Sequence, residues 1–465
     1  MIFHPPFRPF PPPHICATYP TKQQSLIAHT KNELKEKFLS TSRTFVIAFS
    51  GGKDSTCVLQ LFYEMLASLP KHLQRQSYAI ASNTLVEAPH IERFLQRVIH
   101  SINLHAMQNN IPFEVLQVTP ELKDDFFVNL IGKGYPSPTR TFRWCTDRLK
   151  ITPSKNTIAQ ITKKHGLALL VLGTREAESS NRKKSMQKRV LDDHGFSKHE
   201  DYPDTMIYAP LSKWDTDLVW TYLSTHKPLW DMSHSELFRL YAKASGEECQ
   251  FITHLAQSSC GGSRFGCWVC TVVSEDKSLQ GFIDTGEEHL KPLNEFRNYI
   301  KALREDPNAR ADYRRDGRVA YKVGGRGAFL SHIRIEILEK LLACEKAFLS
   351  LGGEGELISK EQILAIQREW NKDFDFHESA LRLGIKYNKG VSMNENKSKI
   401  LQEEIIDEIC ASTENAIVDP RDIKALLKES INIHNNYAIK GRNNAGQRIS
   451  EEIKKLLDDK SRKEA

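Results

Sequence analysis

The sequence of 465 residues contains no apolar run that approaches the ~20 residues needed to cross a bilayer. Its first thirteen residues hold six prolines and no apolar segment typical of a secretory signal peptide. These two absences predict a cytoplasmic protein with no membrane partner. Cysteine is also scarce, with nine in the whole chain. In the cytoplasm these residues are expected to be reduced thiols rather than disulfides.

A strong charge of one sign is absent as well. The net charge of +7 is compatible with a nucleic-acid partner, but it is mild for a chain of this length. A hydrophobic content of 40% and a charged content of 26% are typical of globular proteins. The length predicts roughly two to four domains.

The Walker A pattern GxxxxGK[ST] is missing, but a different glycine-rich loop occupies residues 50–55, with the sequence Ser-Gly-Gly-Lys-Asp-Ser. Residues 44–49 before it are apolar and partly β-branched, which predicts a buried strand. Apolar residues after it recur at helical spacing as far as Pro70. The loop therefore lies at a strand-to-helix turn, where backbone N–H groups and a helix N-terminus converge on one point. Such a point suits an anion.

The residue types within the loop fit a phosphate ligand. The two glycines allow a phosphate oxygen to approach the backbone closely, and the two serines supply hydroxyl donors. Lys53 adds positive charge, and Asp54 is suited either to capping the helix or to holding Mg²⁺. The alternative is an ordinary glycine turn between a strand and a helix.

Apolar strand patterns alternate with helical patterns along the first half of the chain. This alternation predicts an α/β fold with a doubly wound parallel five-stranded sheet. The expected strands are residues 44–49, 77–83, 112–118, 168–172 and 206–210. The predicted organisation is a Pro-rich arm and lead-in helix (1–40), the α/β domain (41–235), a cysteine-rich region with a basic loop (236–328) and a helical C-terminal domain (329–465).

Three motifs fall where ligands of such sheets bind, at the carboxyl ends of strands. Asn83-Thr84 ends the second expected strand, although a turn pair is an equal alternative. Gly173-Thr174-Arg175 ends the fourth, and Arg175 with Arg182 is suited to neutralising phosphates. The third motif is residues 145–150, Cys-Thr-Asp-Arg-Leu-Lys. An exposed basic loop is the alternative for the last two motifs.

Three of the nine cysteines crowd into eleven residues as Cys260, Cys267 and Cys270. The spacing C-x6-C-x2-C is typical of metal ligands, since the glycines between them let the backbone curl. Zinc and a [4Fe–4S] cluster both accept thiolates. The apolar neighbours Phe265 and Trp268 favour the cluster.

A basic stretch at residues 310–326 carries six Arg or Lys side chains and two Asp, a balance of +4. Its two tyrosines are interleaved with these charges, which is compatible with a phosphate backbone. Residues 181–189 carry five basic side chains and could bind in the same way. A solvated loop is the alternative reading of each.

The loop at 50–55 resembles the SGGxDS loop of the PP-loop ATP pyrophosphatases, which holds the pyrophosphate of ATP while AMP is transferred. Residues 145–153 and 173–182 resemble segments of the phosphoadenylyl-sulfate (PAPS) reductase branch, in which the lysine at the position of Lys150 faces the nucleotide. With Gly261–Cys270, nearly the whole chain resembles the DndC-type sulfurtransferases of DNA phosphorothioation.

This resemblance implies ATP-dependent replacement of a non-bridging DNA phosphate oxygen by sulfur. It implies the cofactors ATP, Mg²⁺ and a [4Fe–4S] cluster. Its partners would be DNA, a cysteine desulfurase that donates sulfur and other subunits of the phosphorothioation complex. The implied catalytic residues are Lys53, Asp54, Lys150 and Arg175. The implied ATP-binding residues are Ser50, Gly51, Gly52, Lys53, Asp54, Ser55, Asn83, Thr84, Gly173, Arg175 and Arg182.

The cluster needs a fourth ligand from outside residues 260–270. Cys145 is the expected one, because it lies at the nucleotide mouth, and Cys249 is the reserve. The expected metal ligands are thus Cys145, Cys260, Cys267 and Cys270.

Three other functions remain open. PAPS or adenylyl-sulfate reduction is disfavoured, because no cysteine follows Cys410 and the adjacent Cys–Cys pair of cluster-containing reductases is absent. A tRNA thiolase is the second alternative. The third is a metal-stapled DNA-binding subunit without enzymatic activity, which the intact loop argues against.

Overall fold

The structure is a computed structural model that describes residues 21–199, 202, 204–244, 265–312, 327–373, 375 and 377–393. Its centre is a six-stranded sheet in the order β3-β2-β1-β4-β6-β5. The strands are β1 (Thr44–Phe49), β2 (Ser77–Ser82), β3 (Phe113–Val118), β4 (Ala168–Val171), β5 (Ser197–Lys198) and β6 (Thr205–Tyr208). The first five strands in this spatial order pair in parallel, and β5 pairs antiparallel with β6.

The five parallel strands are those expected from the sequence, so the doubly wound α/β fold is confirmed. The strand count of five is wrong by one, because β5 was missed. With two residues, β5 is too short to produce an alternating pattern.

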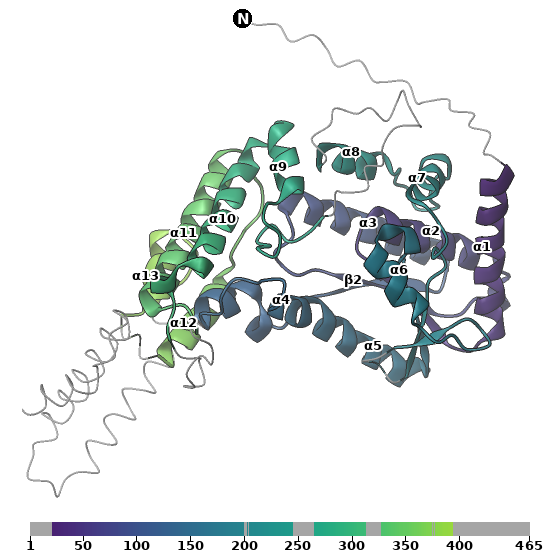
Figure 1. Cartoon of the computed structure of the whole chain (residues 1–465), viewed down its shortest axis with the longest axis horizontal. Helices are drawn as coiled ribbons and strands as arrows, with labels where there is room; N and C mark the ends of the chain where they lie inside the picture. The colour runs from purple at the N-terminus through teal and green to yellow at the C-terminus, as the bar shows by residue number, and fades with distance from the viewer. Residues whose placement is uncertain are drawn as a thin grey trace, which may run out of the picture.

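Helices cover both faces of the sheet because side chains alternate along each strand. Ile47 joins the larger core, beneath α2 (Lys53–Ser68) and α3 (Pro89–Gln108). Its neighbour Val46 points to the other face, where it packs with α5 (Thr152–His165). In Figure 1, α5 runs below the sheet, and α2 and α3 run above it.

The remaining helices extend both ends of this layered unit. They are α1 (Thr21–Ser40), α4 (Trp144–Thr146), α6 (Ser180–Gln187), α7 (Thr216–Thr225), α8 (Ser235–Ala244), α9 (Lys277–Asp284), α10 (Lys291–Glu305), α11 (Ser331–Ser350), α12 (Lys360–Asn371) and α13 (Ser379–Lys386). Helices α9 to α13 gather at one end, coloured green in Figure 1. Within the described residues, no helix has both the length and the hydropathy needed to cross a membrane.

The helical end is joined to the sheet domain by buried polar contacts as well as by apolar packing. It packs on the π-helical turn Val128–Gly132, which follows β3. Trp370 Nε1 donates to the Ile131 carbonyl (3.0 Å), and Arg334 Nη1 donates to the Gly132 carbonyl (2.8 Å). Ser359 and Gln362 form the capping box that starts α12.

Candidate active site

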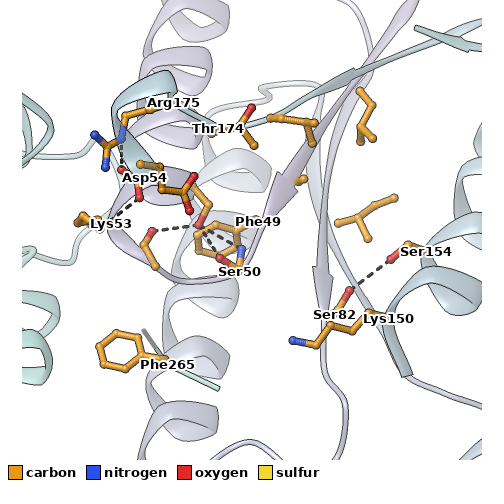
Figure 2. Close-up of a pocket in the computed structure, with 18 of the residues that line it drawn as sticks. Phe49, Ser50, Lys53, Asp54, Ser82, Lys150, Ser154, Thr174, Arg175 and Phe265 are labelled. Atoms are coloured by element: carbon orange, nitrogen blue, oxygen red, sulfur yellow. Dashed lines mark hydrogen bonds and ion pairs between the residues drawn. The ribbon is translucent and has the colours of Figure 1, made fainter. Parts of the chain in front are cut away.

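A cavity of about 760 Å³ lies at the carboxyl edge of the sheet. The strand order reverses between the neighbouring strands β1 and β4, and ligands of doubly wound sheets bind at such a point. The loop that follows β1 and the loop that follows β4 both line the cavity. Figure 2 shows Lys53, Asp54 and Arg175 on one side of this cavity and Lys150 and Ser82 on the other.

The glycine-rich loop is held in shape by its own serines. The Ser50 backbone N–H donates to Ser55 Oγ (3.2 Å), and Ser55 Oγ donates to the Gly52 carbonyl (3.0 Å). Gly51 has a φ of +73°, a backbone conformation that favours glycine. Helix α2 begins with Gly52 as its N-cap and has no side-chain cap. The N-terminus of α2 thus faces the cavity without a cap from its own N-cap side chain, which suits an anion site.

Asp54 and the buried Arg175 form an ion pair at the centre of the site. Arg175 is 2% exposed, and its Nε donates to Asp54 Oδ1 at 2.7 Å. Lys53 Nζ lies 3.3 Å from the other carboxylate oxygen, Oδ2. The suggestion that Asp54 caps helix α2 is wrong, because the N-cap is Gly52 and Asp54 lies in the first turn. Its carboxylate instead pairs with two of the cations that line the cavity, Arg175 and Lys53.

Gly173 lets the loop after β4 approach the first turn of α2. A Cβ at this position would lie 2.8 Å from the Asp54 carbonyl oxygen and 3.1 Å from the Ser55 nitrogen. Both are backbone atoms that cannot swing aside. The glycine therefore brings Arg175, two residues later, within reach of Asp54.

Tyr241 on α8 is a site residue that sequence reasoning missed. Its hydroxyl accepts a hydrogen bond from the Lys53 backbone N–H at 3.2 Å. Its ring lies 5.4 Å from Lys53 Nζ, a cation–π contact. The amphipathic pattern of residues 235–244 could have predicted the helix. Nothing in that pattern points to a loop almost 190 residues away.

Asn83 and Thr84 are buried just after β2 and do not line the cavity. Asn83 donates to Glu92 Oε1 (2.9 Å), and its own Oδ1 accepts from the Leu85 N–H (2.8 Å). Thr84 donates from both its backbone N–H and its hydroxyl to Glu87 Oε2. These bonds match the turn-pair reading of the motif. Glu87 and Ser82, on either side of the pair, are the residues of this segment that line the cavity.

Lys150 brings a positive charge to the side of the cavity opposite Lys53 (Figure 2). Burial lowers the pKa of this lysine, but the nearby thiols of Cys267, Cys145 and Cys270 and the Glu87 carboxylate outweigh it, so the net shift is upward. Lys150 therefore remains charged at neutral pH.

Three of the four expected metal ligands, Cys145, Cys267 and Cys270, lie near Lys150. Burial, followed by the charge of Glu87, raises the pKa of the Cys267 thiol to about 12, and its sulfur lies 3.3 Å from Thr84 Oγ1. Burial and the nearby Cys270 thiol raise the pKa of Cys145. The structure thus brings Cys145 to Cys267 and Cys270 from more than a hundred residues away.

The expected cluster is only partly represented in the structure. Cys260 and the reserve ligand Cys249 lie outside the described residues. Among the residues that are described, no group of three or more His, Cys, Asp or Glu side chains is placed to hold a metal ion. The chemistry of the three neighbouring thiols nevertheless suits zinc or an iron–sulfur cluster.

Two arginines on α10, also missed from the sequence, hold the cysteine-bearing segments in place. Arg297 is fully buried and donates to the backbone carbonyls of Cys270 (2.8 Å), Ser274 (3.0 Å) and Val273. Arg304 donates to the Thr271 carbonyl (3.2 Å). The loop after Cys270 is thus fixed through its main chain to one helix.

The structure describes Arg182 but only a small part of the basic stretch at residues 310–326. Arg182 lines the cavity, and its Nε donates to Glu178 Oε2 at 3.2 Å. Residues 313–326, most of the basic stretch, lie outside the described residues. At the base of the stretch, the Arg310 guanidinium donates to the Gly327 carbonyl. Arg310 therefore closes the base of this stretch.

Comparison with known proteins identifies a matching protein family. Residues 44–273 match the family model of the phosphoadenosine phosphosulfate reductase domain. This part of the chain is a PAPS reductase-like domain. It contains the glycine-rich loop, Lys150, Arg175, Cys145 and the Cys260–Cys270 segment.

Solved structures with partial similarity include two enzymes. One is the PAPS reductase from Candida auris in complex with phosphate, with 12% identity, a TM-score of 0.27, and coverage of 45% of this chain and 87% of that one. The other is the U34-tRNA thiolase NcsA from Methanococcus maripaludis with its [4Fe-4S] cluster. It has 15% identity, a TM-score of 0.27, and coverage of 61% and 79%. No curated protein matches the sequence.

Proposed function

We propose that this chain uses ATP to activate a DNA backbone phosphate and then directs sulfur onto it, as in DNA phosphorothioation. The observation that supports this most is a single cavity with a phosphate-type loop on one side and a lysine beside three thiols on the other. ATP cleavage and sulfur delivery would then take place at adjacent points.

In the first step, the triphosphate of ATP lies against the N-terminus of α2. The backbone N–H groups of the loop and the Lys53 ammonium hold the β- and γ-phosphates, and Mg²⁺ bound with the nucleotide would help to neutralise their charge. Arg175 and Asp54 fix Lys53 and the loop rather than reacting themselves. A non-bridging oxygen of the DNA phosphate attacks the α-phosphorus, and pyrophosphate leaves.

In the second step, Lys150 compensates the negative charge on the adenylated DNA phosphate. Sulfide attacks the DNA phosphorus, and AMP leaves with the former DNA oxygen, so a P–S bond replaces a P–O bond. Sulfur that arrives from a cysteine desulfurase as a persulfide must first be released by a thiol, which is oxidised to a disulfide. A [4Fe–4S] cluster held by Cys145, Cys260, Cys267 and Cys270 would supply a site to hold sulfide before transfer.

The test is to incubate the full chain without oxygen with ATP, Mg²⁺, cysteine, a cysteine desulfurase, a thiol reductant and DNA. The digested DNA is then searched by mass spectrometry for phosphorothioate-linked dinucleotides. We expect these products only when ATP is present, and we expect Lys150→Met to abolish them. Release of sulfite from PAPS under the same conditions would instead favour a reductase, and thiolated tRNA would favour a tRNA thiolase.

The cluster has its own measurement. Protein purified without oxygen should contain about four irons per chain and absorb broadly in the visible range. Cys145→Ser should remove that absorption. One zinc and no colour would rule out the cluster, and loss of colour in Cys249→Ser but not in Cys145→Ser would move the fourth ligand.

A further inference from the structure

A short exposed turn, Arg140-Thr141-Phe142-Arg143, precedes Cys145 by two residues. All four residues are exposed, and Phe142 is 47% exposed. The turn is closed by the Thr139 N–H, which donates to the Phe142 carbonyl (3.1 Å), and by the Phe142 N–H, which donates to Thr139 Oγ1 (2.9 Å). A compact turn thus presents an aromatic ring between two arginines.

The base of this turn is anchored in the protein interior. Ser137 Oγ donates to the Ile300 carbonyl on α10 (3.0 Å), and Thr271 Oγ1 donates to the Pro138 carbonyl (2.8 Å). After the turn, Trp144 is buried, and its Nε1 donates to the Pro136 carbonyl (2.9 Å). The turn is therefore fixed relative to the Cys145 and Cys270 segments, in contrast to a freely solvated loop.

Within the part of the chain that the structure describes, no acidic side chain pairs with the arginines of the turn. Residues 126–146 contain three basic side chains and no Asp or Glu. Among the described residues, neither Arg140 nor Arg143 takes part in an ion pair. Guanidinium groups bind phosphate well, and an exposed aromatic ring stacks on an unpaired base, so this combination is typical of surfaces that bind single-stranded nucleic acid.

We propose that the turn Arg140–Arg143 binds a single-stranded segment of the DNA substrate. Arg140 and Arg143 hold backbone phosphates, and Phe142 stacks on a base. Because the turn leads directly into Cys145, a DNA phosphate held there lies next to the thiols and Lys150. This inference rests on the proposed function and adds to it the conformation of the substrate and the surface that holds it.

The experiment measures binding of a fluorescently labelled single-stranded oligonucleotide to the full chain by anisotropy, over a range of salt concentrations. Arg140→Ala with Arg143→Ala should weaken binding and reduce the slope of log K against log salt by about 1.4 for two lost phosphate contacts. Phe142→Ala should weaken binding by about fivefold or more with an unchanged slope, because it removes stacking rather than charge. It should have no effect on an oligonucleotide without bases.

The charge control is Lys163→Ala with Lys164→Ala. These exposed residues end α5 at the opposite edge of the sheet from the cavity, so binding should stay within twofold of the unmodified protein. If the unmodified protein binds DNA and the turn variants bind it equally well, the proposed surface is overturned but the proposed function is not. Failure of the unmodified protein to bind any DNA would overturn the proposed function. Tighter, turn-dependent binding of RNA of the same sequence would overturn DNA as the substrate.

Discussion

Gly173 is the position at which one methyl group should most clearly disrupt the nucleotide site. In Gly173→Ala, the new Cβ would lie 2.8 Å from the Asp54 carbonyl oxygen and 2.9 Å from its carbonyl carbon, so backbone must move. Such overpacking costs about 1–3 kcal/mol of the free energy of unfolding. For a domain of this size, that corresponds to a fall in Tm of about 2–12 °C. The movement separates Arg175 from Asp54 and distorts the N-terminus of α2, so ATP affinity should fall at least about tenfold.

The matched control is Gly266→Ala, because Gly266 also lines the cavity and its added Cβ would meet no atom within 4 Å. Thermal unfolding of both variants with and without ATP separates the loss of stability from the loss of binding. We expect Gly266→Ala to behave like the unmodified protein. A Gly173→Ala variant with unchanged Tm and ATP affinity would refute the reasoning that the two loops form one rigid site.

Three further predictions follow from particular side chains. Asp54→Asn should lower the free energy of unfolding by about 3 kcal/mol, because it leaves the buried Arg175 guanidinium without its carboxylate. Arg175→Gln should lower it less, because the Asp54 side chain is 22% exposed and keeps Lys53 as a partner. In urea unfolding, the double variant should lose less free energy of unfolding than the two single variants lose together. Additive losses would show that the pair does not interact. Arg297→Gln should release the loop after Cys270 and speed alkylation of the Cys270 thiol in metal-free protein, with Arg297→Lys intermediate; equal rates would contradict this positioning role. Because the pKa of Lys150 lies above its ordinary value of 10.5, its contribution to DNA binding should stay constant from about pH 7 to 9. A loss of this contribution at the alkaline end, measured against Lys150→Met, would place its pKa lower.

The sequence was sufficient for the fold and for the position of the loop because both depend on local patterns. Residues 44–55 carry a strand, a glycine turn and a helix start in direct succession, and parallel strands place such turns at one edge. Five of the six strands were therefore predictable, and β5 was not, since two residues show no alternation.

Contacts between distant segments could not be predicted from the sequence. The N–H of Lys53 donates to Tyr241, and Arg297 holds the Cys270 loop from a neighbouring helix. Nothing in the local pattern of either residue marks it for this role, because the partner is fixed only by packing. Asn83 illustrates the same limit: a polar pair at a strand end resembles a ligand contact, and in the structure its hydrogen bonds close a turn.

The central claim is that the cavity cleaves ATP between its α- and β-phosphates. The most direct measurement is chromatographic identification of the nucleotide products after incubation with Mg²⁺ and DNA. AMP and pyrophosphate in equal amounts, greatly reduced in Lys53→Met, are the predicted result. ADP and inorganic phosphate, or AMP and pyrophosphate formed equally well by Lys53→Met, would contradict the account.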